Sequence, residues 1–185
     1  SRNDKIRRIS HAAAERSHPT PFPPGADLAH DTIAVIDFGG QYAHLIATKI
    51  RRRGVRAEIR QPEDPVEGFQ RYQGIVISGS PSLASHGEDS EYTKEIYDLD
   101  VPILGFCFGH QQIAQHYGGE VEHGGREWGK AELHLDAQHP LFKGLDDVEQ
   151  VFMSHYDSVI SVGPDFEEIG HSITGLASEH RYAAI

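Results

Sequence analysis

The sequence predicts an α/β fold of three layers, in which a mostly parallel open sheet has helices on both faces. Two observations lead to this prediction. From residue 31 to residue 117, apolar runs of strand length alternate with segments whose apolar residues recur at helical spacing, which is the pattern of successive βαβ units. Further along the chain the apolar residues alternate with period two, which predicts a few antiparallel strands toward the C-terminus.

The composition narrows the class of protein before any motif is considered. The 185 residues are 38% hydrophobic, enough for one domain with a substantial core. A formal net charge of −11 argues against nucleic-acid binding, which needs clustered lysine and arginine. A single cysteine cannot form an internal disulfide and fits a reducing compartment. Since we find neither a signal-peptide pattern nor an apolar stretch of about 20 residues, we expect a cytoplasmic protein without a membrane partner.

Residues 1–30 differ from the rest of the chain. This stretch is polar and contains four prolines near its end, which predicts an N-terminal tail or linker. Residues 31–185 are therefore the predicted folded domain.

The first predicted elements follow directly on this tail. "DTIAVIDFGG" is an apolar run of strand length, and "QYAHLIATKIRRRG" has helical spacing up to Gly54, which we expect to end the helix. The basic run at residues 51–53 would complement the helix dipole at that end. "VRAEIR" alternates as a strand does.

Two further strand–helix pairs are predicted next. "GIVISGS" is a buried-strand run and "SEYTKEIYDL" a helix with Ser90 as its N-cap; "VPILGF" is a strand and "GHQQIAQHY" a helix that Gly118 and Gly119 end. The remaining strands are predicted in "REWGKAELHLDA", in "VEQVFMSHYDSVISV" and around a turn in "ITGLASEHRYAAI". These later strands could extend the parallel sheet with antiparallel members.

The stretch "GFCFG" contains the only cysteine, Cys107. A residue at a tight strand-to-helix turn projects its side chain at the carboxyl edge of a parallel sheet, where ligands bind. Its flanking glycines, Gly105 and Gly109, would allow helix and strand to approach closely, and a helix N-terminus favours a thiolate. The pattern therefore indicates a nucleophile, and a buried structural cysteine is the alternative.

Two other loops are candidates for the same site. "ISGSPS", residues 77–82, ends a strand with small residues whose backbone N–H groups could stabilise an oxyanion, or could form an ordinary turn. "MSHYDSV", residues 153–159, interrupts an apolar strand with polar residues, among which His155 could be a base, a binding residue or a surface histidine. "IDFGGQ" lacks the dinucleotide-binding spacing, and no cluster has zinc-ligand spacing, so no metal site is predicted.

Taken together and in order, these stretches resemble the motifs of class I glutamine amidotransferase domains. The similarity covers residues 32–185 and includes "VIDFGGQYAHLIATKIRRRGV", "GIVISGSPS", "PILGFCFGHQQIAQHYGG", "REWG" and "MSHYDSV". "FGGQY", "REWG" and "SHYDSV" make it most similar to the glutaminase part of the GMP synthase branch. The resemblance implies a flavodoxin-like sheet and hydrolysis of L-glutamine to glutamate and ammonia.

The resemblance also implies roles for individual residues. Cys107 matches the nucleophile that forms a glutamyl thioester, and the backbone N–H groups of Ser80 and Phe108 match the oxyanion-hole donors. The residues that match substrate-binding positions are Gly79, Gln111, Ser154, His155 and Tyr156. Arg126 and Asp157 match stretches that face the synthetase domain in the GMP synthase branch.

The chain departs from the family pattern in two places. Ser80 stands in Gly79-Ser80-Pro81 where the family usually has a second glycine, so the donor at position 80 requires a φ that is not positive. The catalytic histidine and glutamate of the family are expected beyond Ile185, which makes the predicted domain C-terminally incomplete. His139-Pro140 is no substitute, because Leu141 follows it.

Three hypotheses follow from the resemblance. The first is a glutaminase that passes ammonia to an ATP-pyrophosphatase (synthetase) domain or subunit, where ATP and Mg²⁺ would act on XMP; the glutaminase itself needs no cofactor. The second is a stand-alone γ-glutamyl hydrolase-like enzyme. The third is a pseudo-enzyme that lacks the His-x-Glu pair.

Overall fold

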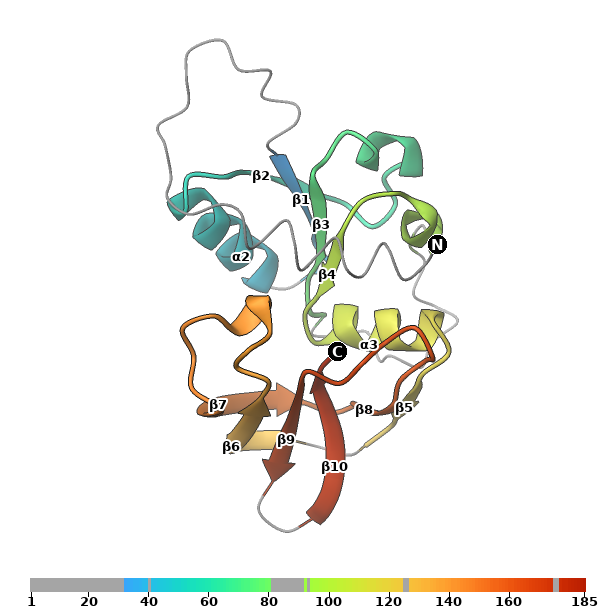
Figure 1. Cartoon of the computed structure of the whole chain (residues 1–185). Helices are drawn as coiled ribbons and strands as arrows, with labels where there is room; N and C mark the ends of the chain where they lie inside the picture. The colour runs from blue at the N-terminus through green and yellow to red at the C-terminus, as the bar shows by residue number, and fades with distance from the viewer. Residues whose placement is uncertain (1–31, 40, 81–91, 93, 125–126, 175–176) are drawn as a thin grey trace. The chain divides into compact units, whose positions relative to one another are not determined.

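A computed structural model describes residues 32–39, 41–80, 92, 94–124, 127–174 and 177–185 of the chain (Figure 1). The predicted N-terminal tail, residues 1–30, lies outside the described residues, as does Ser90. The described residues fall into two compact units, a first one that runs up to His110 and a second one that starts at Gln111.

The first unit contains the predicted parallel sheet. Its strands are β1 (Thr32–Ile36), β2 (Arg56–Arg60), β3 (Gly74–Ile77) and β4 (Ile103–Gly105), in the order β2-β1-β3-β4. All three neighbouring pairs are parallel. The central strands β1 and β3 are almost entirely buried, as continuous apolar runs in a parallel sheet should be.

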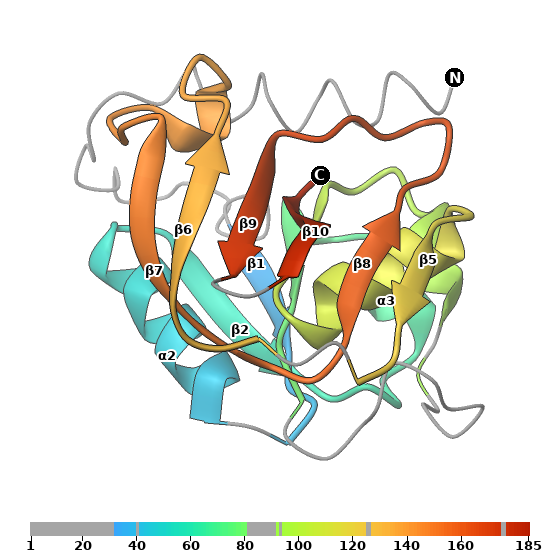
Figure 2. The ribbon, with the colours of Figure 1, turned by 90° about the horizontal axis from the view of Figure 1, so that it is seen from below.

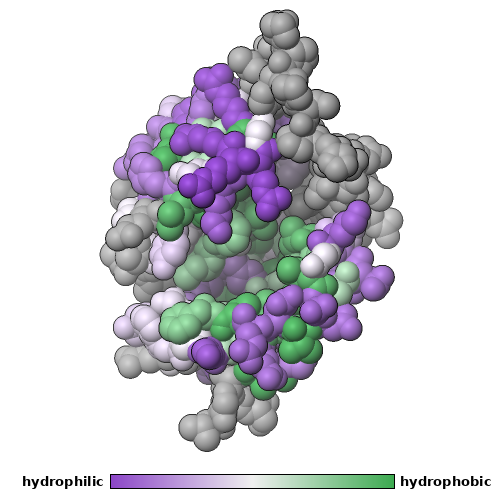
Figure 3. All heavy atoms as spheres, turned by 90° about the vertical axis from the view of Figure 1, so that its left-hand side faces the viewer, coloured by the Kyte–Doolittle hydropathy of each residue, from purple (hydrophilic) through white to green (hydrophobic). Residues whose placement is uncertain are grey.

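Helix α2 (Gln41–Arg52) connects β1 to β2. Its small residues Ala43 and Ala47 are fully buried against Val35 and Val76 of the sheet, while its outer side carries the hydrophilic residues that gather with scattered hydrophobic ones in Figure 3. The helix ends as predicted, because Gly54 adopts a φ of +80°. The basic run does more than complement the dipole, since the Arg51 guanidinium donates to the Ala57 carbonyl at 2.7 and 3.2 Å.

The connections on either side of β3 are 3₁₀ turns. Turn η1 (Val66–Phe69) precedes the strand and η2 (Lys94–Asp98) follows it. The segment "SEYTKEIYDL" was predicted as a longer helix; its described part is only the single turn η2, whose Ile96 and Tyr97 are buried. Burial of adjacent apolar residues suits a tight turn better than the one-sided stripe of a long surface helix.

The second unit is built from antiparallel strands (Figure 2). Strands β6 (Glu127–Leu135), β7 (Val148–His155), β9 (Gly170–Thr174) and β10 (Ala177–Ala184) form a four-stranded sheet in the order β10-β9-β6-β7. The antiparallel strands were predicted, and they form sheets of their own instead of extending the parallel one. The short turn η3 (Pro140–Phe142) lies between β6 and β7.

Helix α3 (Phe108–His116) runs from the first unit into the second, where β5 (Glu120–Glu122) follows it. Strand β5 was not predicted because its three residues are too short to show a period. It pairs with β8 (Ser158–Ser161). Gly119 packs between the two, since a Cβ there would lie 2.6 Å from the Ser161 carbonyl oxygen.

None of the described helices is both long enough and apolar enough to cross a membrane.

Candidate active site

Cys107 occupies the turn between strand β4 and helix α3. It is the only non-glycine residue in the described part of the chain with a positive φ, of 52°, and it is exposed. A side chain in the left-handed region costs free energy and is found where geometry demands it. The alternative of a buried structural cysteine is therefore wrong, and the sulfur stands at the N-terminus of α3, where backbone N–H groups favour a thiolate.

The flanking glycines make this turn possible. A Cβ at Gly105 would lie 2.3 Å from the backbone carbon of Gly109, and a Cβ at Gly109 would lie 2.5 Å from the Ile77 carbonyl oxygen. Both distances are far below van der Waals contact, so only glycine lets the start of α3 pack directly onto β3 and β4. A Cβ at Gly79 would lie 3.3 Å from the Cβ of Cys107, which places the loop after β3 beside the cysteine.

Ser80 follows Gly79 in this loop without a positive φ. Serine can therefore replace the family's glycine here without backbone strain. Its hydroxyl donates to the carbonyl of Phe38 at 3.2 Å, and the hydroxyl of Ser78 accepts from the N–H of Phe38 at 3.3 Å. These two bonds tie the loop after β3 to the end of β1.

An aromatic cluster lies under the turn. The ring of Phe108, which is 1% exposed, packs 5.0 Å from the ring of Phe38 and 6.5 Å from that of Tyr92. The Tyr92 hydroxyl is hydrogen-bonded to that of Tyr97 at 2.7 Å. Burial raises the pKa of Tyr92 to about 12, although the bond to Tyr97 opposes the rise, so this phenol stays neutral and structural.

In the second unit, the segment after β7 is held by a buried glutamine. The side-chain amide of Gln111 donates to the Asp157 carbonyl at 2.7 Å, and both residues are buried. The same carbonyl lies 2.9 Å from Nδ1 of His155. Gln111 and the "SHYD" segment, both matched to substrate-binding positions by the sequence, are thus in direct contact.

Glu127, in the "REWG" motif, faces His155 across the sheet. The two residues are paired between β6 and β7, and Oε2 of Glu127 lies 3.1 Å from Nε2 of His155. Ser172 of β9 donates to the other oxygen at 2.7 Å. Burial raises the pKa of Glu127, but the hydrogen bonds from His155 and Ser172, with the charge of Arg181, outweigh it and lower the pKa below its ordinary value.

Asp157 anchors the same segment from its other side. Its carboxylate lies 2.7 Å from Nδ1 of His123 and accepts from the N–H of Gly124 at 3.4 Å. Next to it, Tyr156 is 54% exposed and packs edge-on against Trp128, with ring centroids 5.5 Å apart. Ser154 is paired with Trp128 across the β6–β7 ladder.

The predicted residues therefore fall into two groups within the two units. The first unit brings together Gly79, Ser80, Cys107 and Phe108; the second brings together Gln111, Ser154, His155, Tyr156 and Asp157. Arg126 lies outside the described residues. His139 caps η3, where its ring accepts from the N–H of Leu141 at 3.3 Å, which is a structural role.

Sequence reasoning assigned no role to two residues that organise the second group, Glu127 and His123. Glu127 lies within the quoted motif "REWG", and its burial follows from the period-two alternation of β6, in which Glu127, Ala131 and Leu135 are all buried. No comparable signal marks His123, because it reaches Asp157 from the loop after β5.

Comparison with known proteins agrees with this geometry. Residues 34–185 match the family described as glutamine amidotransferase class-I. A GMP synthase (glutamine-hydrolyzing) of Symbiobacterium thermophilum is 43% identical over 144 residues, which are 76% of this chain and 28% of that protein. The corresponding GMP synthase of Pyrobaculum aerophilum is 39% identical over 157 residues, 84% of this chain and 31% of that protein. The chain thus spans less than a third of these curated relatives.

A solved structure is similar as well. It is a smaller GMP synthase component from Thermoplasma acidophilum, which superposes with a TM-score of 0.67 at 25% identity; the match covers 82% of this chain and 87% of that one. The superposition identifies the class of fold, and the family match covers most of the length of this chain. The chain belongs to the class I glutamine amidotransferase family.

Proposed function

We propose that the chain is the glutaminase part of a GMP synthase-type enzyme, which hydrolyses L-glutamine and delivers ammonia for the amination of XMP. The observation that carries the proposal is Cys107, exposed at a φ of 52° between a parallel strand and a helix N-terminus. Such a conformation is costly for a residue with a Cβ and is kept where it serves the chemistry.

The proposed reaction begins with the Cys107 thiolate. Its sulfur attacks the side-chain amide carbon of glutamine, and the carbonyl oxygen becomes an oxyanion held by the N–H groups of Ser80 and Phe108. The C–N bond then breaks as the nitrogen gains a proton, so that ammonia leaves and a thioester remains. Water attacks the thioester, the C–S bond breaks, and glutamate and the thiolate are released.

The remaining roles come from other parts of the chain. Gly79 and Gln111 would line the substrate position, and the backbone of Ser154, His155 and Tyr156 would hold the α-amino and α-carboxylate groups of glutamine. The histidine that transfers the protons, and the glutamate that orients it, are expected on the C-terminal side of Ile185.

The ammonia acceptor is proposed to lie in a synthetase domain or subunit. The relatives named as GMP synthases are three to four times longer than their matched segments, which leaves room for such a domain, whereas the Thermoplasma chain is matched over most of its length. ATP and Mg²⁺ would act there in the cytoplasm, and Asp157 and Arg126 are the proposed contacts to it.

The test uses a glutamine analogue with an electrophilic diazoketone in place of the amide. We expect the full-length protein to gain one adduct by intact mass, mapped to Cys107, and to hydrolyse free glutamine; Cys107→Ser should lose both. Preferential hydrolysis of γ-glutamyl amines over glutamine would favour the γ-glutamyl hydrolase alternative. A folded protein that neither forms the adduct nor releases ammonia would contradict the proposal and identify a pseudo-enzyme.

A further inference from the structure

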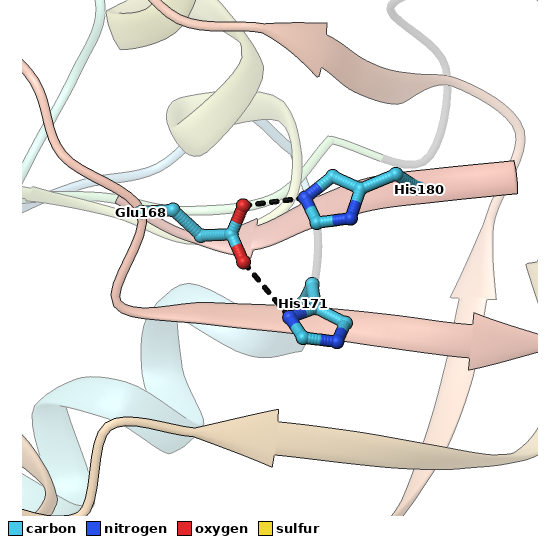
Figure 4. Close-up of side chains that lie close together, drawn as sticks. All are labelled: Glu168, His171 and His180. Carbon is cyan, nitrogen blue, oxygen red and sulfur yellow. Dashed lines mark hydrogen bonds and ion pairs between the residues drawn. The ribbon is translucent and has the colours of Figure 1, made fainter.

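Glu168, His171 and His180 come together at the β9–β10 hairpin of the second unit (Figure 4). One carboxylate oxygen of Glu168 lies 2.8 Å from Nδ1 of His171, and the other contacts Nε2 of His180. Each residue offers one metal-ligating atom, and these three atoms all lie within 4.8 Å of one another. Two imidazoles and one carboxylate are a ligand set that holds zinc in proteins.

The register of three neighbouring strands builds this cluster. His171 on β9 is paired with Tyr182 on β10 and with His134 on β6, and paired side chains lie on the same face of a sheet. His180 precedes Tyr182 by two residues and shares its face. The ring centroids of His171 and His180 are 4.9 Å apart, and those of His134 and His171 are 5.2 Å apart in nearly parallel planes.

The charges and polar atoms around the cluster leave a place for a cation. The ion pairs of Glu168 are with the two histidines and with no lysine or arginine among the described residues. Behind them, Nε2 of His134 is the single buried side-chain nitrogen or oxygen of the described residues that has no hydrogen-bond partner. A buried polar atom in this condition calls for an explanation, and a bound ion with its water would bring a hydrogen-bonding group to this row of rings.

We propose that Glu168, His171 and His180 bind one divalent transition-metal ion of the zinc class, with water in the fourth position. Ligands about 2.0–2.2 Å from zinc lie roughly 3.4 Å from one another in a tetrahedron, so small side-chain rotations would close the present arrangement around an ion. The ion would replace the hydrogen bonds of the carboxylate and release protons. Because Glu168 precedes β9 and His180 lies on β10, the bound ion would clasp the ends of the hairpin together.

The test measures Zn²⁺ affinity in the full-length protein by competition with a chromophoric chelator, and the Co²⁺ absorption spectrum as a second readout. All variants carry Cys107→Ser, because the thiol is itself a zinc ligand. The site variants are His171→Asn and His180→Asn, which keep a hydrogen-bonding side chain of similar size. The control is His44→Asn, on α2, where the side chain is 71% exposed and lies 3.8 Å from Asp37.

We expect one equivalent of Zn²⁺ in the parent and in the His44→Asn control. Each site variant should bind at least about tenfold more weakly, lose the tetrahedral Co²⁺ band, and lose a zinc-induced rise in Tm of a few degrees. Equal Zn²⁺ affinity in the parent and both site variants would overturn the proposal. The absence of stoichiometric binding in a folded parent would overturn it as well, and would leave Glu168 as a carboxylate that only bridges two imidazoles. Neither outcome affects the glutaminase test, which reads the sulfur of Cys107.

Discussion

Glu127 and His155 face each other across strands β6 and β7, with 3.1 Å between Oε2 of the carboxylate and Nε2 of the ring. The other ring nitrogen, Nδ1, lies 2.9 Å from the Asp157 carbonyl, which can only accept. The ring of His155 is therefore fixed between two acceptors, and its orientation sets the course of the backbone from Ser154 to Asp157. A buried carboxylate thus positions the segment proposed to hold the substrate.

Replacing Glu127 with glutamine should destabilise the second unit. The substitution removes the charge-assisted bonds to His155 and Ser172 at a residue that is 3% exposed. Bonds of this kind are worth about 1–3 kcal/mol when one buried partner is left unsatisfied. Chemical denaturation at pH 7 should show this decrease in the free energy of unfolding, while Glu120→Gln, at an exposed position of β5, should change it by less than about 0.5 kcal/mol.

The same carboxylate should make stability depend on pH. The pKa of Glu127 is lowered in the folded protein, so its stabilising contribution is present above the pKa of the unfolded chain, near 4.3, and is lost as the pH falls through the folded-state pKa. Between pH 5 and pH 3 the free energy of unfolding should therefore fall less steeply in Glu127→Gln than in the parent. Parallel curves for the two proteins would show that Glu127 does not titrate differently on folding.

The parallel half of the fold could be predicted because each of its elements is encoded locally. The strands β1 and β3 are apolar runs, α2 has helical spacing, and Gly54 ends that helix with a positive φ. The turn at Cys107 could be predicted for the same reason, because its glycines stand next to it in the sequence. A short element such as β5 could not be predicted, since three residues carry no periodic signal.

The contacts of the second unit depend on strand register, which the sequence does not reveal. Glu127 reaches His155 and Ser172 only because β6 pairs with both β7 and β9. The cluster of Glu168, His171 and His180 arises in the same way, from pairing between β9 and β10. Spacing rules for metal sites find ligands on one loop or helix, and they overlook ligands that different strands supply.

The close approach of α3 to β3 can be tested at Gly109. An alanine Cβ would lie 2.5 Å from the Ile77 carbonyl oxygen and 2.8 Å from its Cβ, so the helix start would have to move. We expect Gly109→Ala to lower the free energy of unfolding by about 1–3 kcal/mol and to reduce glutaminase activity, since the neighbouring turn holds Cys107. Gly68→Ala is the control, because its Cβ would meet only the end of the flexible Arg60 side chain, at 3.2 Å.

The buried amide of Gln111 offers a further test. Gln111→Ala removes the 2.7 Å bond to the Asp157 carbonyl, but that carbonyl keeps the ring nitrogen of His155. The expected cost in thermal or chemical unfolding is therefore about 1–2 kcal/mol, less than for an orphaned acceptor. Gln115→Ala on the same helix is the matched control, because its side chain is half-buried and contacts Gln112 at 3.3 Å; a loss equal to that of Gln111→Ala would contradict the assignment.

The positive φ of Cys107 should be visible as a difference between two substitutions that both remove the thiol. At a φ of 52° an alanine keeps the clash between its Cβ and the backbone, whereas glycine has none. Cys107→Gly should therefore be more stable than Cys107→Ala by about 1 kcal/mol, although glycine is normally the less stabilising residue. The same pair at Ser80, whose φ is not positive, should show the ordinary order, with alanine at least as stable as glycine. If alanine and glycine were equally stable at position 107, the turn would relax without the thiol, and the strain would belong to the cysteine side chain itself and not to the backbone that presents it.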